Sequence, residues 1–118
     1  MIQILSMNIR GMGDASKLYC LRDLFATEDP IIILCQETLC RRDKAIKAFL
    51  SIQSGWYAST VDATGHSGGM ITFWNPYKAN IRACSFFGGM LLSSYIRGIE
   101  GIFNIINLYA PYQNRITF

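Results

Sequence analysis

The segment that most restricts the fold is a run of five apolar residues, Ile31–Cys35, which directly follows Pro30. The first three are isoleucines, and β-branched side chains favour strands over helices. A run of this length and composition is typical of a strand that is buried on both faces of a sheet. Such a strand needs a covering layer on each side, so we expect a layered fold.

The segments on either side of this run alternate between strand and helix before the chain becomes a series of strands. An apolar strand is expected over residues 2–9. Asp14 or Ser16 can cap the helix that follows, and Pro30 terminates it. The other expected elements are a helix over 43–52, a glycine-rich connection at 65–69, and strands over 56–61, 70–74, 81–87, 91–97 and 103–109. This order predicts an α/β sandwich with a mixed sheet.

Composition limits the chain to one domain with an unusually apolar character. Of 118 residues, 51% are hydrophobic and 16% are charged, against roughly 25% charged in an ordinary soluble domain. This excludes a disordered chain and leaves two interpretations: a sheet-rich domain, or a piece of a larger fold whose other half is absent. The net charge of +3 is compatible with a polyanionic partner but does not by itself indicate one.

The sequence argues against a membrane protein, an exported protein and a zinc-binding protein. The longest uncharged stretch in the apolar middle, Ala83–Ile96, has 14 residues, whereas a spanning helix needs about 20. The N-terminus lacks the basic region of a signal peptide. The four cysteines form no C-x-x-C pair and the chain has one histidine, so we expect reduced, mostly buried thiols in an intracellular protein of the nucleus or cytoplasm.

Glu37 is the polar residue that most needs an explanation, because it follows an apolar run that should be buried. A carboxylate near the interior requires a cation or hydrogen bonds to offset its desolvation. One interpretation is a hard cation such as Mg²⁺, which binds one or two carboxylates together with water and phosphate oxygens. The other is a structural role, in which Glu37 caps the next turn or pairs with Arg10, Arg41 or Arg42.

Asn8 and Tyr109, which close the first and last strands, also allow two interpretations each. Asn8 can hydrogen-bond a phosphate or a metal-bound water, or it can satisfy backbone groups of the turn. Tyr109 can offer its phenol to a phosphate oxygen, or its ring can pack while its hydroxyl is bonded locally. His66 is a weak candidate for a general base, since no carboxylate that would orient it has a recognisable place.

For two further features we prefer a structural interpretation to a functional one. The Gly68-Gly69 pair is expected to serve backbone geometry and not to cradle a phosphate, because no helix follows it. The basic cluster near residues 41–47 is expected to be a solvated helix start, although it can also face a phosphate. The cluster consists of Arg41, Arg42, Lys44 and Lys47.

Four short elements, taken in order, resemble the endonuclease/exonuclease/phosphatase superfamily. They are Ser6–Gly11, Pro30–Thr38, Ser67–Gly69 ahead of Phe73–Pro76, and Asn107–Pro111. Within that superfamily the sequence is most similar to the endonuclease domain of plant LINE-type (non-LTR) retrotransposons. The strand followed by Gln-Glu-Thr is the most specific element, and the similarity extends over nearly all of the chain.

The resemblance implies a four-layer αββα sandwich of the DNase I-like type and Mg²⁺-dependent hydrolysis of a phosphodiester, with DNA as the partner. By position, Glu37 would be the metal ligand, and Asn8 would contact the metal's water or the phosphate. Tyr109 would match the tyrosine that supports the transition state at the scissile phosphate. Arg10 would be a further substrate-binding residue.

The chain departs from the family pattern in two respects. Many relatives have Asn directly after the Tyr-Ala-Pro element, where this chain has Tyr112. Residues 1–118 also correspond only to the first half of the family's domain, so we expect them to form a single truncated domain. The second half of the family's domain supplies a Gly-Asp-x-Asn element, which activates and positions the attacking water, and a late Asp-His pair. Neither is found in this chain. We therefore expect apolar sheet faces without their partner layer, and no catalysis by this chain alone.

Two alternatives remain open beside the endonuclease. One keeps the superfamily and changes the substrate to a phosphoinositide or another small phosphate ester. The other is a non-catalytic fragment that binds nucleic acid weakly, and in that case binding should fall steeply with salt. The residues that would carry such binding are Arg10, Arg41, Arg42 and Lys44.

Overall fold

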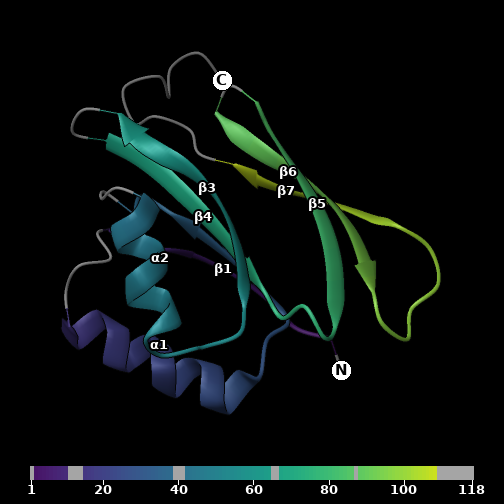
Figure 1. The fold of residues 1–118 in the computed structure, drawn as a ribbon, viewed down its shortest axis with the longest axis horizontal. Helices are drawn as coiled ribbons and strands as arrows, with labels where there is room; N and C mark the ends of the chain where they lie inside the picture. Colours follow the sequence, from purple (N-terminus) through teal and green to yellow (C-terminus); the bar gives the residue numbers. More distant parts are fainter. Residues whose placement is uncertain (1, 11–14, 39–41, 65–66, 87, 109–118) are drawn as a thin grey trace.

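The computed structural model describes residues 2–10, 15–38, 42–64, 67–86 and 88–108 as two sheets and two helices (Figure 1). Neither helix in these ranges is long and apolar enough to cross a membrane. In chain order the elements are β1 (Ile4–Asn8), α1 (Ala15–Glu28), β2 (Ile32–Gln36), α2 (Arg42–Leu50), β3 (Tyr57–Thr64), β4 (Ser67–Trp74), β5 (Ala79–Phe86), β6 (Gly89–Ile96) and β7 (Phe103–Leu108).

The first sheet has the strand order β1-β2-β4-β3 and is mixed, as predicted. Strands β1 and β2 are parallel, whereas β4 is antiparallel to both β2 and β3. Helices α1 and α2 lie on one face of this sheet (Figure 1). Their contact with it is aromatic at its centre, where the Phe49 ring of α2 stacks on Phe73 of β4 with centroids 3.5 Å apart and also contacts Phe25 of α1.

The second sheet, β5-β6-β7, is antiparallel throughout and packs on the other face of the first sheet (Figure 1). Its buried side chains Met90, Leu92 and Ile96 belong to one cluster with Ile32 and Leu34 of β2. Ile33 and Cys35, which alternate with them, belong to the cluster under the helices. Strand β2 is therefore buried on both faces, and the sequence prediction is confirmed.

The outer face of the second sheet carries exposed apolar side chains. Ile106 and Leu108 alternate with the inward residues of β7 and are 55% and 60% exposed. Ile106 is paired with Leu91 of β6, which is also exposed. No helix among the described residues covers this face (Figure 1). Within the described ranges, this sheet face therefore presents apolar side chains to solvent.

Three local expectations differ from the structure. Ser16 lies inside α1 and not at its cap, because the helix begins at Ala15; Asp14 is outside the described residues. Strand β4 begins at Ser67, so Gly68 and Gly69 lie within a strand instead of a connection. Of the three described thiols Cys35 is buried, but Cys20 and Cys84 are exposed because they lie on solvent-facing sides of α1 and β5.

We expect Cys35 to resist alkylation in the folded protein. Burial raises the pKa of its thiol from 9.0 to about 12, so the reactive thiolate is absent at pH 8. Iodoacetamide at pH 8 should modify Cys20 and Cys84 and should modify Cys35 only after denaturant is added, as measured by peptide mass spectrometry. Because folding raises this pKa, stability should also fall as the pH rises above 9. Rapid modification of Cys35 without denaturant would contradict its burial.

Polar substitution on the outer face of the second sheet should reduce the exposed hydrophobic surface without lowering the stability of the fold. Ile106→Thr combined with Leu108→Thr should lower the binding of a hydrophobic dye and change the free energy of unfolding by less than about 0.5 kcal/mol. The matched control is Leu92→Ala on the inner face, which should cost about 2–5 kcal/mol. A comparable loss in the double variant would mean that this face is covered in solution.

Candidate active site

The carboxyl ends of β1 and β2 meet at one edge of the first sheet because these two strands are parallel neighbours. Asn8 is paired with Gln36, and the Ile9 N–H donates to the Gln36 carbonyl at 3.1 Å, which extends the ladder by one residue. In α/β folds the loops beyond the carboxyl ends of strands are the usual place for a site. Two predicted site residues, Asn8 and Glu37, are therefore brought to the same edge.

Both loops leave this edge through a left-handed residue. Arg10 has a φ of 45° and Glu37 has a φ of 54°, a backbone region that residues other than glycine seldom adopt. Such a conformation costs on the order of 1–3 kcal/mol and persists only where the surroundings enforce it. Both residues lie just beyond a strand end and face each other, so two of the three described non-glycine residues with positive φ are at the predicted site; the third, Asp29, follows α1.

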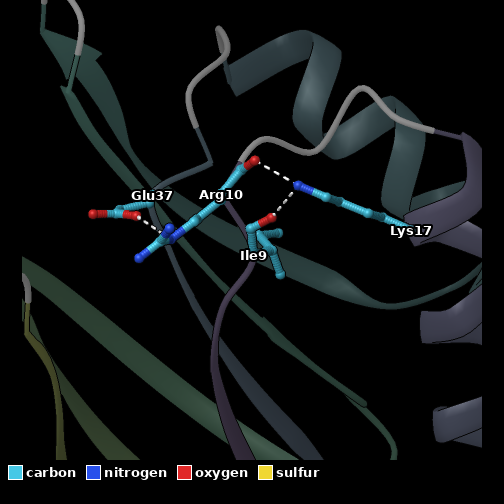
Figure 2. A network of polar contacts seen from close by, with 4 residues as sticks. All are labelled: Ile9, Arg10, Lys17 and Glu37. Atoms are coloured by element: carbon cyan, nitrogen blue, oxygen red, sulfur yellow. Dashed lines mark hydrogen bonds and ion pairs between the residues drawn. The ribbon is translucent and has the colours of Figure 1, made fainter.

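Lys17 of α1 holds the loop that follows β1. Its ammonium donates to the Ile9 carbonyl at 2.8 Å and to the Arg10 carbonyl at 2.6 Å (Figure 2). These carbonyls are beyond the last ladder bond of β1, so the charged donor satisfies them in place of water. Sequence reasoning gave no role to Lys17, since its partners are backbone atoms that no motif records.

The Glu37 carboxylate points toward the Arg10 guanidinium (Figure 2), with 3.8 Å between Arg10 Nε and Glu37 Oε2. The Arg10 side chain is 80% exposed and that of Glu37 is 26% exposed. A loose pair of this kind contributes about 0–1 kcal/mol, so it leaves the carboxylate able to exchange partners. The structural interpretation that pairs Glu37 with Arg10 is observed; Arg41 lies outside the described residues.

Glu37 is suited to a hard cation as one ligand among several. It supplies a partly exposed carboxylate whose present partner is weakly held, and Mg²⁺ commonly takes one or two protein carboxylates and completes its shell with water and phosphate. The described ranges contain no group of three or more His, Cys, Asp or Glu side chains that would enclose a metal. The fit is therefore to an open, water-rich site and not to an all-protein cage.

Asn8 projects from the face of β1 that is turned toward the second sheet. Leu5 and Met7 pack on the helix side, so Asn8 and Ser6 lie on the opposite face, where Ser6 contacts the Gln36 side chain. Asn8 is exposed, so a ligand at this edge can reach it. Tyr109 and His66 lie outside the described residues.

The Gly68-Gly69 pair serves backbone geometry, in agreement with the preferred interpretation. Gly69 has a φ of 85°, and its carbonyl accepts the N–H of Thr38 at 3.3 Å. Thr38 is buried, so this bond anchors the chain directly after Glu37. A side chain would strain the backbone at this φ.

Comparison with known proteins shows the fold. No protein-family model matches the sequence, and no curated protein is significantly similar to it. Solved structures do match. The AP endonuclease LMAP from Leishmania major superposes with a TM-score of 0.68 at 16% identity, over 98% of this chain and 43% of that chain. The human Nocturnin catalytic domain has a TM-score of 0.66 at 12% identity, over 89% of this chain and 48% of that chain.

A third neighbour is Danio rerio TDP2 complexed with a single-strand DNA product, with a TM-score of 0.62 at 12% identity, over 98% of this chain and 52% of that chain. These neighbours share the DNase I-like fold of the endonuclease/exonuclease/phosphatase superfamily. The chain therefore has a partial DNase I-like fold and spans about half the length of the structures it matches. The predicted fold class is confirmed.

Two replacements of Glu37 should separate the free-energy cost of its left-handed backbone from the contribution of its carboxylate. Glycine adopts the left-handed region without strain, so Glu37→Gly should be more stable than Glu37→Ala by about 1 kcal/mol. Both variants remove the same carboxylate and the same pair with Arg10. Urea unfolding of the two variants measures the difference. An alanine variant at least as stable as the glycine variant would show that residue 37 is not held in this conformation.

Proposed function

We propose that this chain is the N-terminal part of a Mg²⁺-dependent domain that cleaves phosphodiesters in DNA. The observation that carries the proposal is the placement of Glu37, Asn8 and Arg10 together at the strained end of β1 and β2 in a partial DNase I-like fold. This is the end at which an α/β sheet presents its loops. The site therefore has a carboxylate, an amide and a cation within one edge.

Each of these groups has a part that follows from its chemistry. Glu37 would hold the metal ion, which when bound stabilises negative charge that builds on phosphoryl oxygens. Asn8, with both a donor and an acceptor, would orient a water or a phosphate oxygen. Arg10 would turn its exposed guanidinium to a phosphate, for which a planar five-donor group is well suited. Tyr109, carried by the segment after β7, would bind the scissile phosphate through its phenol.

The structural neighbours support DNA as the substrate in this proposal. One is an AP endonuclease and another was solved with a single-strand DNA product. The order of the four sequence elements further supports an origin in a LINE-type retrotransposon endonuclease.

Half of such a domain lacks groups that the chemistry needs. The chain spans 43–52% of the three neighbours, and no Gly-Asp-x-Asn or Asp-His element occurs in its sequence. General acid–base help is worth roughly 10²–10⁴-fold in rate, so its loss leaves the chain inactive alone. The exposed outer face of β5–β7 supports a partner that supplies the rest of the domain.

Incubation of the purified 118-residue chain with supercoiled plasmid and Mg²⁺ should give no nicked product above the buffer blank. The control is a DNase I-like nuclease under the same conditions. Mg²⁺-dependent nicking that disappears in Glu37→Ala would refute inactivity of the chain while supporting the role of Glu37.

Metal binding can be tested without activity. Titration calorimetry with Mn²⁺, used as a probe for Mg²⁺, should show a site that Glu37→Gln removes. Glu100→Gln is the matched control, because Glu100 is an exposed carboxylate in the turn between β6 and β7 and should leave the binding unchanged. Equal binding by Glu37→Gln and the wild-type chain would contradict the metal assignment.

A further inference from the structure

A chain of side-chain hydrogen bonds joins the two sheets next to Glu37. The Gln36 amide donates to the Asn107 amide oxygen at 2.9 Å, and Asn107 Nδ2 donates to the Thr72 hydroxyl at 3.1 Å. The Thr72 hydroxyl in turn contacts Met90 Sδ at 3.6 Å. These hydrogen bonds run from β2 to β7, then back to β4, and finally to β6. We call these four residues the inter-sheet network.

The inter-sheet network is buried and directional. Asn107 and Thr72 are 0% exposed, in a region where an unpaired polar group costs about 1–3 kcal/mol. Asn107 uses its oxygen as an acceptor toward β2 and its nitrogen as a donor toward β4. A primary amide offers both functions on two separate atoms without carrying a charge. The identity of residue 107 is therefore tied to hydrogen bonding and not to packing alone.

Gln36 connects this network to the candidate site. Besides its bond to Asn107, its Nε2 lies 3.2 Å from the Ser6 hydroxyl and 3.3 Å from the Leu34 carbonyl, so the side chain is fixed from both sheets. Glu37 follows directly, with its left-handed φ of 54°, and Thr38 on its other side is anchored to Gly69. The strained residue is thus clamped between two immobilised neighbours.

We propose that Asn107 and Gln36 are positioning residues, which hold Glu37 in its left-handed conformation and so aim its carboxylate at the cation site. The part of this inference that concerns the cation rests on the proposed function. Asn107 never reaches that site; it acts through the Gln36 side chain and the peptide that links Gln36 to Glu37. The same bond ties β2 to β7.

The first experiment measures Mn²⁺ affinity by calorimetry for Gln36→Leu, Asn107→Leu and the double variant. Each single change should weaken binding about tenfold or more, as for other residues that orient a metal ligand. Because the two residues act in series, the double variant should be no weaker than the weaker single variant. Losses that multiply in the double variant would overturn the series arrangement.

Ile96→Val is the matched control for general loosening of the sandwich. Ile96 is buried on β6, belongs to the cluster between the sheets and lies outside the network. Its Mn²⁺ affinity should stay close to that of the wild-type chain. An equal loss in Ile96→Val would mean that the network acts only through stability.

The second experiment needs no metal. A left-handed residue has a short distance between its amide and α protons, so the intraresidue NOE of Glu37 should be strong in the wild-type chain and in Ile96→Val. The NOE should weaken in both Gln36→Leu and Asn107→Leu. Gln36 is half-buried, so its replacement is the milder of the two changes. An unchanged NOE in both would overturn the proposal. Weakened NOEs in a chain that binds no Mn²⁺ would uphold the positioning role and refute the metal assignment.

Discussion

Strand β2 has no face in contact with solvent, and the other described layers are arranged around that fact. Its odd-numbered residues Ile33 and Cys35 require the helices, while Ile32 and Leu34 require the second sheet. Burial of such side chains contributes about 1.5–3 kcal/mol each, so neither layer can be lost without exposing the strand. Strands β1 and β2 are parallel because α1, which connects them, returns the chain to the end of the sheet where β1 began.

The same burial creates the candidate site. Strand β2 is buried along its length, so it ends where polar residues begin, at Gln36 and Glu37. The left-handed turn at Glu37 and the one at Arg10 are tolerated because Lys17, Gly69 and the inter-sheet network hold the backbone around them. Stability of the sandwich and geometry of the site are therefore connected through a few hydrogen bonds.

Much of the fold could be read from residue patterns. The apolar run at 31–35, the glycines between the later strands and Pro30 placed strands and helices correctly, since these signals are local. The start of β4 was missed because Gly68 and Gly69 resemble a loop, yet cross-strand pairing with β3 extends the strand through them. The burial of the cysteines was misjudged because it depends on which side of an element faces a neighbouring layer.

For the site, residue patterns were enough to put Asn8 after the first strand and Glu37 after the buried strand. This was possible because strand ends are set by local polarity. How these groups meet depends on contacts that form only when the chain is folded. The pairing of Glu37 with Arg10 and the bond between Gln36 and Asn107 join residues distant in sequence, whereas Lys17 bonds the Arg10 carbonyl seven residues away. The Gln36–Asn107 bond comes from packing one sheet on the other, and the Glu37–Arg10 pair comes from the parallel pairing of β1 with β2. No local pattern encodes either arrangement.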